Sequence, residues 1–447
     1  MRIPPEALIT LNTAEKSPIG PILFKLVHEV EDLKLFHSKN DLVLALFLAS
    51  VSPLSDEKGE DEVSDDTTYE GVRKYLATLP ENDSFDNIPR RWSIKKLETL
   101  LGGTSVLDRL MDEKRGLEND YKLLKASHVQ AQIDAKGNET LFLFPTFSKL
   151  DQTIAVVSSR AFQSLGGDGV DCMIPLLDCI NHKRGVGETN DVTYKKEKDG
   201  SIHLIARHDL EKDSTPGITY GAKGNAQLLS RYGFTLENNL EPDGSSNDIF
   251  EIKIYGQKCE FRAGPKSYTY GCLVKALSLT SKANPANEVE DDGPCGMEDF
   301  LNACEDEGEA FDGMYGGMEM EGEDNNMSED DETDESIAIE IHGLQSLIHE
   351  LKEVKKRYSL SGDSLENALS SPLDTSEYFS GILVKSEMRA LKLYIDSIQL
   401  ILSKLKGERG GMKSNQGNES EDCRLLYEQA TELSAAYIAI RHPELSY

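Results

Sequence analysis

The chain has 447 residues, with 48 Lys and Arg against 79 Asp and Glu, so its formal net charge is −31. This length allows roughly two or three domains. The acidic balance excludes the basic stripe typical of nucleic-acid-binding proteins, and the absence of an apolar run of ~18 residues excludes a membrane-spanning helix.

The seven cysteines contain no Cys-x-x-Cys pair. An odd number of cysteines in a long chain favours free thiols in a reducing compartment, and their spacing does not fit a zinc cluster. The N-terminus shows no signal-peptide pattern. We therefore expect a soluble protein inside the cell, without a metal centre.

The chain from residue 19 to about residue 126 is predicted to be mainly helical. Apolar residues recur at helical spacing between residues 19 and 126, and the long apolar stretch 41–51 is typical of a buried helix. Residues 153–162 end in Ser159-Arg160-Ala161-Phe162. An arginine such as Arg160 is suited to binding a carboxylate, although a surface salt bridge is an equally ordinary use.

Residues 173–234 carry the most unusual pattern of the chain. An apolar run ends in Asp178-Cys179-Ile180-Asn181-His182, and two predicted strands at 191–194 and 201–206 follow, joined by a turn at 198–200. The segment closes with Tyr220-Gly221 and, ten residues later, Arg231-Tyr232-Gly233-Phe234. Alone, Asn-His is more often a loop cap and Tyr-Gly-Phe more often core and turn; the ordered combination is much more specific.

The C-terminal part is predicted to contain strands at 249–255 and 258–262 and long helices at 337–358, 377–405 and 423–440. Between them, residues 288–335 hold 21 acidic residues and no Lys or Arg. We predict an acidic disordered segment at 281–336, because such a composition buries too little apolar surface to order itself.

The motifs of residues 173–234 together resemble the catalytic half of a SET-domain protein methyltransferase. The most similar subgroup contains the Rubisco large-subunit lysine methyltransferase and the actin histidine methyltransferase. The resemblance implies an α+β fold: a SET β-fold with a pseudoknot and a helical insertion at about 20–150, within a catalytic domain at 1–270. A helical substrate-binding domain is then expected at 271–447.

The resemblance also implies roles for individual residues. Tyr220 matches the catalytic tyrosine. Five residues match positions that hold S-adenosylmethionine: Arg160, Asp178, Asn181, His182 and Phe234. Tyr232 and Tyr194 match positions in the channel that receives the substrate side chain.

The expected reaction is S-adenosylmethionine-dependent N-methylation of a lysine in a non-histone protein, with histidine as the less favoured acceptor. The partner is then a protein substrate, with no nucleic acid and no membrane, and we expect a monomer. The expected compartment is the cytoplasm or nucleus, or a plastid if an N-terminal segment precedes this sequence.

Two departures from the family pattern set up an alternative. The Gly-x-Gly turn that approaches the cofactor in the family comes before Ile3-Pro4 and is missing from this sequence. Ser164 stands where the Rubisco enzyme carries a second arginine, which argues against Rubisco as the substrate. The alternative is a catalytically inactive SET scaffold that binds proteins, with the acidic segment attracting basic partners.

Overall fold

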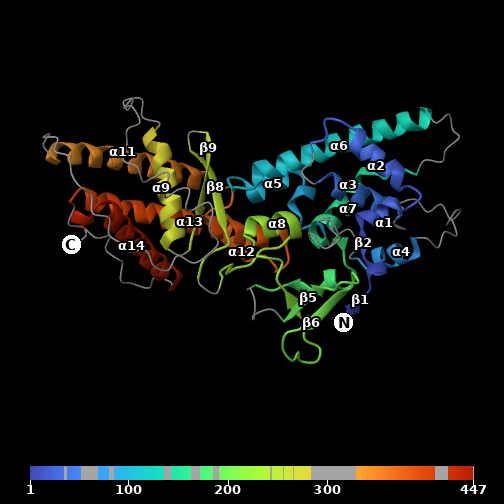
Figure 1. Cartoon of the computed structure of the whole chain (residues 1–447). Coiled ribbons are helices and arrows are strands. Elements are labelled where there is room, and N and C mark those ends of the chain that lie inside the picture. Colours follow the sequence, from blue (N-terminus) through green and yellow to red (C-terminus); the bar gives the residue numbers. More distant parts are fainter. Residues whose placement is uncertain are drawn as a thin grey trace, which may run out of the picture. The chain divides into compact units, whose positions relative to one another are not determined.

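Figure 1 shows a computed structural model of the chain, coloured from the N-terminus to the C-terminus. The structure describes residues 1–34, 38–51, 69–79, 85–134, 142–162, 172–184, 191–241, 244–254, 256–264, 266–282, 329–407 and 421–445.

The chain divides into two compact units. Unit 1 comprises Met1–Pro242 and Ser359–Val384, and unit 2 comprises Asp243–Tyr358 and Lys385–Tyr447. These units begin and end elsewhere than at the predicted boundary after residue 270, because the strands after residue 248 pack with the C-terminal helices. The catalytic and substrate-binding roles given to 1–270 and 271–447 stay predictions.

The described strands of unit 1 are short and form small sheets. They are β1 (Arg2–Ile3), β2 (Ile9–Thr10), β3 (Cys172–Met173), β4 (Asn181–His182), β5 (Val192–Lys196), β6 (Ile202–Ala206) and β7 (Gly217–Ile218). The strand order is β1-β6-β5 in one sheet, and β2 pairs with β3 and β4 with β7. The turn between β5 and β6 suits its sequence, because Asp199 accepts the N–H of Ser201 over 2.9 Å and Gly200 takes a positive φ of 83°.

Helices make up most of the rest of unit 1. They are α1 (Leu11–Glu15), α2 (Gly20–Glu29), α3 (Lys39–Val51), α4 (Glu70–Leu76), α5 (Ile94–Leu101), α6 (Leu107–Asp134), α7 (Phe147–Arg160), α8 (Asn225–Tyr232) and α12 (Asp363–Leu369). Short 3₁₀ helices are η1 (Pro5–Ala7), η4 (Pro89–Arg91) and η5 (Leu177–Cys179).

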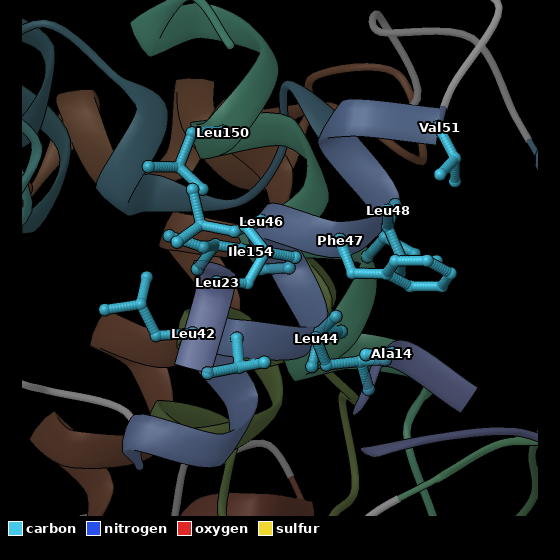
Figure 2. Close-up of a cluster of buried hydrophobic side chains, with 14 of the residues drawn as sticks. Ala14, Leu23, Leu42, Leu44, Leu46, Phe47, Leu48, Val51, Leu150 and Ile154 are labelled. Carbon is cyan, nitrogen blue, oxygen red and sulfur yellow. The ribbon is translucent and has the colours of Figure 1, made fainter. Parts of the chain in front are cut away.

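Helix α3 is the centre of the unit 1 core. Every residue from 42 to 49 is buried, which explains why this helix is apolar on all sides. Figure 2 shows Leu46 of α3 among Leu23 of α2 and Leu150 and Ile154 of α7. The predicted buried helix is confirmed, and α7 is packed firmly against the core.

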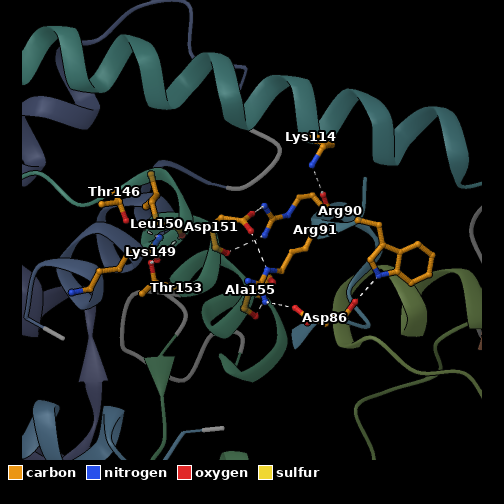
Figure 3. Close-up of polar contacts among 12 residues, drawn as sticks. Asp86, Arg90, Arg91, Lys114, Thr146, Lys149, Leu150, Asp151, Thr153 and Ala155 are labelled. Carbon is orange, nitrogen blue, oxygen red and sulfur yellow. Dashed lines mark hydrogen bonds and ion pairs between the residues drawn. The ribbon is translucent and has the colours of Figure 1, made fainter. Parts of the chain in front are cut away.

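A buried ionic cluster, formed by Arg90, Arg91 and Asp151, fixes the other side of α7 (Figure 3). Asp151 accepts a hydrogen bond from Arg90 Nη1 on one carboxylate oxygen and from Arg91 Nε, over 3.1 Å, on the other. The side chain of Arg90 is only 5% exposed. The cluster therefore ties α7 to η4, and α7 is the helix that ends at Arg160.

Unit 2 combines a β-hairpin with long helices. Its described elements are β8 (Ile249–Ile254), β9 (Gln257–Arg262), α9 (Lys266–Lys282), α11 (Glu329–Lys356), α14 (Glu421–Arg441) and η7 (Pro443–Leu445), with most of α13 (Ser376–Leu405). The hairpin and the long helices predicted from the sequence are confirmed, with ends shifted by a few residues except at the start of α11.

The prediction of disorder for residues 281–336 is wrong at both ends of that segment. Residues 281–282 belong to α9, and residues 329–336 already belong to α11. At the start of α11, the reason is that acidic residues suit the first turns of a helix, where they face the positive end of the helix dipole. Residues 283–328 lie outside the described residues.

Candidate active site

The two motif segments of the sequence lie side by side. β4 and β7 are parallel neighbours, which brings the Asn181-His182 pair next to Tyr220. The backbone N–H of Tyr220 donates to His182 Nδ1 over 3.0 Å, and the Tyr220 hydroxyl donates to the Ile180 carbonyl oxygen over 2.8 Å. The backbone N–H and the hydroxyl of Tyr220 are therefore both hydrogen-bonded to the chain around the Asn-His pair.

Four aromatic rings gather around this point. The ring centroids of Tyr220 and Tyr232 are 4.9 Å apart, and those of His182 and Tyr220 are 5.1 Å apart. Phe234 lies 6.1 Å from both His182 and Tyr232. These spacings are those of attractive aromatic pairs, so the rings fix one another in place.

Gly233 allows both Tyr232 and Phe234 to belong to this group of rings. It ends α8 with a positive φ of 78°, a conformation that suits glycine. A Cβ at this position would also lie 3.1 Å from the backbone of Asn87. The Tyr-Gly-Phe motif therefore combines a helix end with two aromatic side chains.

Arg160 is placed by the end of α7. The helix begins after Thr146, whose hydroxyl accepts the N–H of Lys149, and it ends at Arg160 before the extended residue Ala161. Arg160 Nη1 donates to the carbonyl oxygen of Asp178 over 3.0 Å and to its Oδ2 over 3.3 Å. The guanidinium is therefore held along one edge by a single residue.

Asp178 is buried beneath Arg160. Its side chain has no solvent exposure. Besides Arg160, its carboxylate accepts a hydrogen bond from the Tyr75 hydroxyl over 2.6 Å, and the Cys179 thiol lies 3.8 Å from Oδ1. A buried carboxylate with charged and neutral donors satisfies the general rule that buried polar groups are hydrogen-bonded.

A cavity of about 430 Å³ lies in unit 1 beside these residues. Five of the predicted site residues belong to its wall: Arg160, Asp178, Tyr194, Tyr220 and Tyr232. In the described structure, the other three lie outside that wall: Asn181, His182 and Phe234.

The two groups of predicted residues differ in surroundings. His182 and Phe234 contact the rings of Tyr220 and Tyr232 from outside the cavity wall, and Asn181 is exposed within β4. The structure thus brings all the motif residues close to Tyr220, but it divides them between the cavity and the neighbouring aromatic group.

Burial determines the protonation of the central side chains. It raises the pKa of Tyr220 to about 12, although the positive charge of Arg160 acts in the opposite direction. Burial also lowers the pKa of His182, and the charge of Arg184 adds to that effect. Tyr220 is therefore a neutral hydroxyl near pH 7, and neutral His182 can accept the Tyr220 N–H.

Several residues of the cavity wall were not predicted from the sequence. Phe162 packs edge-on against Tyr194, with ring centroids 5.5 Å apart. Lys223 also belongs to the wall, and burial followed by the nearby charge of Arg231 lowers its pKa. Phe162 is the last residue of the Ser-Arg-x-Phe motif and Lys223 lies two residues after Tyr220-Gly221, so proximity to a motif was the available signal. Tyr75, which lies outside that wall and donates to Asp178, has no such signal.

Ser164 lies outside the described residues. Among the residues that are described, no group of three His, Cys, Asp or Glu side chains could hold a metal ion. No helix within the described ranges combines the length and the apolar character needed to cross a membrane.

No known protein-family model matches the chain. Curated proteins give partial matches. The chain is 33% identical over 98 residues to the ribosomal lysine N-methyltransferase set10 of Schizosaccharomyces pombe, covering 21% of this chain and 18% of that protein. It is 24% identical over 199 residues to the N-lysine methyltransferase setd6 of Danio rerio, covering 41% and 39%.

A longer match covers 64% of this chain, with 23% identity over 290 residues, and 41% of the actin-histidine N-methyltransferase of Danio rerio. The chain thus spans less than half the length of each of these relatives.

Solved structures match over nearly the whole chain. The SET domain of LSMT bound to lysine and AdoHcy has a TM-score of 0.57 and 15% identity, covering 95% of this chain and 88% of that one. Rubisco LSMT bound to AdoMet has a TM-score of 0.55 and 16% identity, with the same coverage. At this identity the likeness shows the fold. The predicted resemblance and the predicted SET fold, with its helical C-terminal region, are confirmed.

Proposed function

With the SET fold as the premise, we propose that the chain is an S-adenosylmethionine-dependent protein methyltransferase that methylates a lysine of a non-histone protein. The observation that carries this proposal is the position of Tyr220. It lies on the cavity wall, and its backbone N–H and its hydroxyl both donate hydrogen bonds to the segment that contains Ile180 and His182. Tyr194 and Tyr232 belong to the same wall and would line the channel for the acceptor side chain.

The residues present fit a cofactor with an anionic group and an adenine ring. Only Nη1 of Arg160 is bonded to Asp178, and the side chain is 19% exposed at the cavity, so further N–H donors remain for a carboxylate. Asn181, His182 and Phe234 would hold the adenine part, with β4 supplying backbone groups. S-adenosylmethionine supplies a methyl group on a cationic sulfur.

The protein's own contribution is to select and orient a neutral nitrogen. A free lysine has a pKa of ~10.4, so its amine must lose a proton before it can attack carbon. A channel walled by Tyr194, Tyr220 and Tyr232 favours the neutral amine, because burial penalises the charged form. The Tyr220 hydroxyl, which stays protonated, can accept a hydrogen bond from the amine while it donates to Ile180.

Lysine is the favoured acceptor because two of the relatives are named lysine N-methyltransferases, whereas histidine is the acceptor in the name of the third. A protein substrate is common to all three names. The substrate-binding role of the helical region 271–447 is part of the same proposal.

The test is a methyl-transfer assay. The purified chain is incubated with methyl-labelled S-adenosylmethionine and a protein extract, and mass spectrometry locates the labelled residues. We expect label on lysine side chains and its loss when S-adenosylhomocysteine competes. Label on histidine would show that the acceptor is histidine and not lysine. No transfer and no binding of S-adenosylhomocysteine would contradict the enzyme proposal and leave the inactive scaffold.

A further inference from the structure

Tyr75 contacts Asp178 of the candidate active site, although it belongs to none of the motifs of the sequence. It belongs to α4, in the predicted helical insertion, and is 6% exposed. Its ring is part of the apolar cluster around α3. Its hydroxyl donates to Asp178 Oδ2 over 2.6 Å, across 103 residues of sequence.

The contact matters because of where Asp178 and Arg160 lie. The Asp178 carboxylate is fully buried, and Oδ2 is the oxygen that also accepts from Arg160 Nη1 over 3.3 Å. Oδ2 is therefore contacted by Tyr75 from the core and by Arg160 from the cavity side. Without the hydroxyl, a buried oxygen keeps only one charged donor, and its orientation is less restricted.

The position of the Asp178 carboxylate in turn sets the edge of the Arg160 guanidinium that remains free. Nη1 is committed to Asp178 through both the carboxylate and the carbonyl oxygen. An arginine has five N–H donors in a rigid plane, so fixing one nitrogen directs the others. A rotation of Asp178 would therefore redirect the donors that face the cavity.

We propose that Tyr75 is a positioning residue, which holds Asp178 and through it orients Arg160 toward the anionic group of the cofactor. The ligand contact of Arg160 rests on the proposed function. Burial and the negative charge of Asp178 both raise the pKa of Tyr75, so the hydroxyl is a protonated donor near pH 7.

A matched pair of variants separates this role from a general contribution to packing. Tyr75→Phe removes the hydroxyl and keeps the ring in the core. Tyr121→Phe makes the same change at a tyrosine that packs on the same apolar cluster but donates to the Pro145 carbonyl oxygen, over 3.1 Å, away from Asp178. Each variant loses one tyrosine hydroxyl hydrogen bond, which is buried at Tyr75 and partly buried at Tyr121, and only the first is coupled to Arg160.

The experiment records arginine side-chain nitrogen NMR spectra, assigned with Arg160→Lys, together with calorimetric titration of S-adenosylhomocysteine. In the wild type, we expect restricted rotation of the Arg160 guanidinium. In Tyr75→Phe, we expect this restriction to be lost and affinity to fall by about tenfold, the cost of one misplaced charge-assisted hydrogen bond, with kcat at saturating cofactor changed by less than about twofold. Tyr121→Phe should change neither readout.

Three results would overturn the proposal: free rotation of Arg160 in the wild type, an unchanged Arg160 in Tyr75→Phe, or a released Arg160 with unchanged affinity. The first needs no variant, so the proposal stays testable if Tyr75→Phe does not fold. A wild type that binds no S-adenosylhomocysteine and transfers no methyl group would contradict the proposed function instead. The NMR spectra would then still decide whether Tyr75 orients Arg160.

Discussion

Two arginine–aspartate pairs, each with one member on α7, use the same chemistry in different surroundings. Arg90 and Arg160 both belong to the wall of the cavity, and each is bonded to an aspartate. Arg90 is 5% exposed and shares the two oxygens of Asp151 with Arg91. Arg160 is 19% exposed, and its partner Asp178 also accepts hydrogen bonds from neutral groups, the Tyr75 hydroxyl and the Cys179 thiol.

The difference shows how one residue type serves two purposes. In the Asp151 pair, both carboxylate oxygens bind arginines from η4, so the contact joins two elements. In the Asp178 pair, Nη1 is the guanidinium nitrogen that donates to the aspartate. We infer that the first pair serves mainly stability and the second mainly ligand binding. The predictions below test that division.

The largest expected effect is on stability, in Asp151→Asn. Removing this charge deprives the buried Arg90 of its Asp151 partner, while Arg91 keeps an ion pair with Asp86 over 3.6 Å, and the free energy of unfolding should fall by about 3–5 kcal/mol. Urea denaturation measures this change. The matched control is Glu70→Gln, which breaks the exposed pair with Lys74 and should leave the denaturation midpoint nearly unchanged. A midpoint shift for Asp151→Asn no larger than the control's would contradict the stabilising role.

Asp178→Asn should affect ligand affinity more than stability. Arg160 can still reach water, so the free energy of unfolding should fall by only about 1–3 kcal/mol. Affinity for S-adenosylhomocysteine, however, should fall by about tenfold or more, because the guanidinium loses its fixed orientation. Titration and denaturation of the same sample check both numbers. A stability loss equal to that of Asp151→Asn, without a loss of affinity, would erase the distinction between the two pairs.

The smallest effect concerns pH and the part of the site without an arginine–aspartate pair. Burial holds the pKa of His182 below its ordinary value of 6.5. The folded protein therefore binds fewer protons than the unfolded chain at this residue, so its contribution to stability is complete above pH 6.5 and is lost as pH falls through the folded pKa.

His182→Asn keeps a hydrogen-bond acceptor near the Tyr220 N–H but cannot titrate. Below pH 6.5, the ordinary value for His182, its free energy of unfolding should fall less steeply with pH than that of the wild type. The difference should be at most about 1.4 kcal/mol for each unit of pKa shift. His128, whose pKa burial also lowers, is present in both proteins and cancels. Parallel curves for the two proteins would show that His182 is not the titrating group.

The residues around Tyr220 could be predicted from the sequence because they lie within motifs. Tyr220, Tyr232 and Arg160 occupy fixed offsets in short segments, and local structure is enough to present them: the end of α7 for Arg160 and the end of α8 for Tyr232. The pairing of β4 with β7 brings Tyr220 next to the Asn181-His182 pair.

Tyr75 and Asp151 could not be predicted in the same way. Their partners lie 103 and about 60 residues away, and nothing in the surrounding sequence distinguishes a buried tyrosine of α4 from one that only packs. These contacts depend on how α4, η4 and α7 pack together, which periodicity does not encode. The helical start of α11 was missed for a different reason, because composition alone suggested disorder where acidic residues favour a helix end.

The most direct test of the central claim is Tyr220→Phe, with methyl transfer and S-adenosylhomocysteine titration measured on the same protein. We expect kcat to fall by about 10²-fold or more, because the hydroxyl acts on the reacting nitrogen, and cofactor affinity to change by less than about twofold. Tyr121→Phe, the control, should leave both unchanged. An unchanged kcat, or a loss of cofactor binding that accounts for all the lost activity, would contradict the assignment of Tyr220 as the catalytic residue.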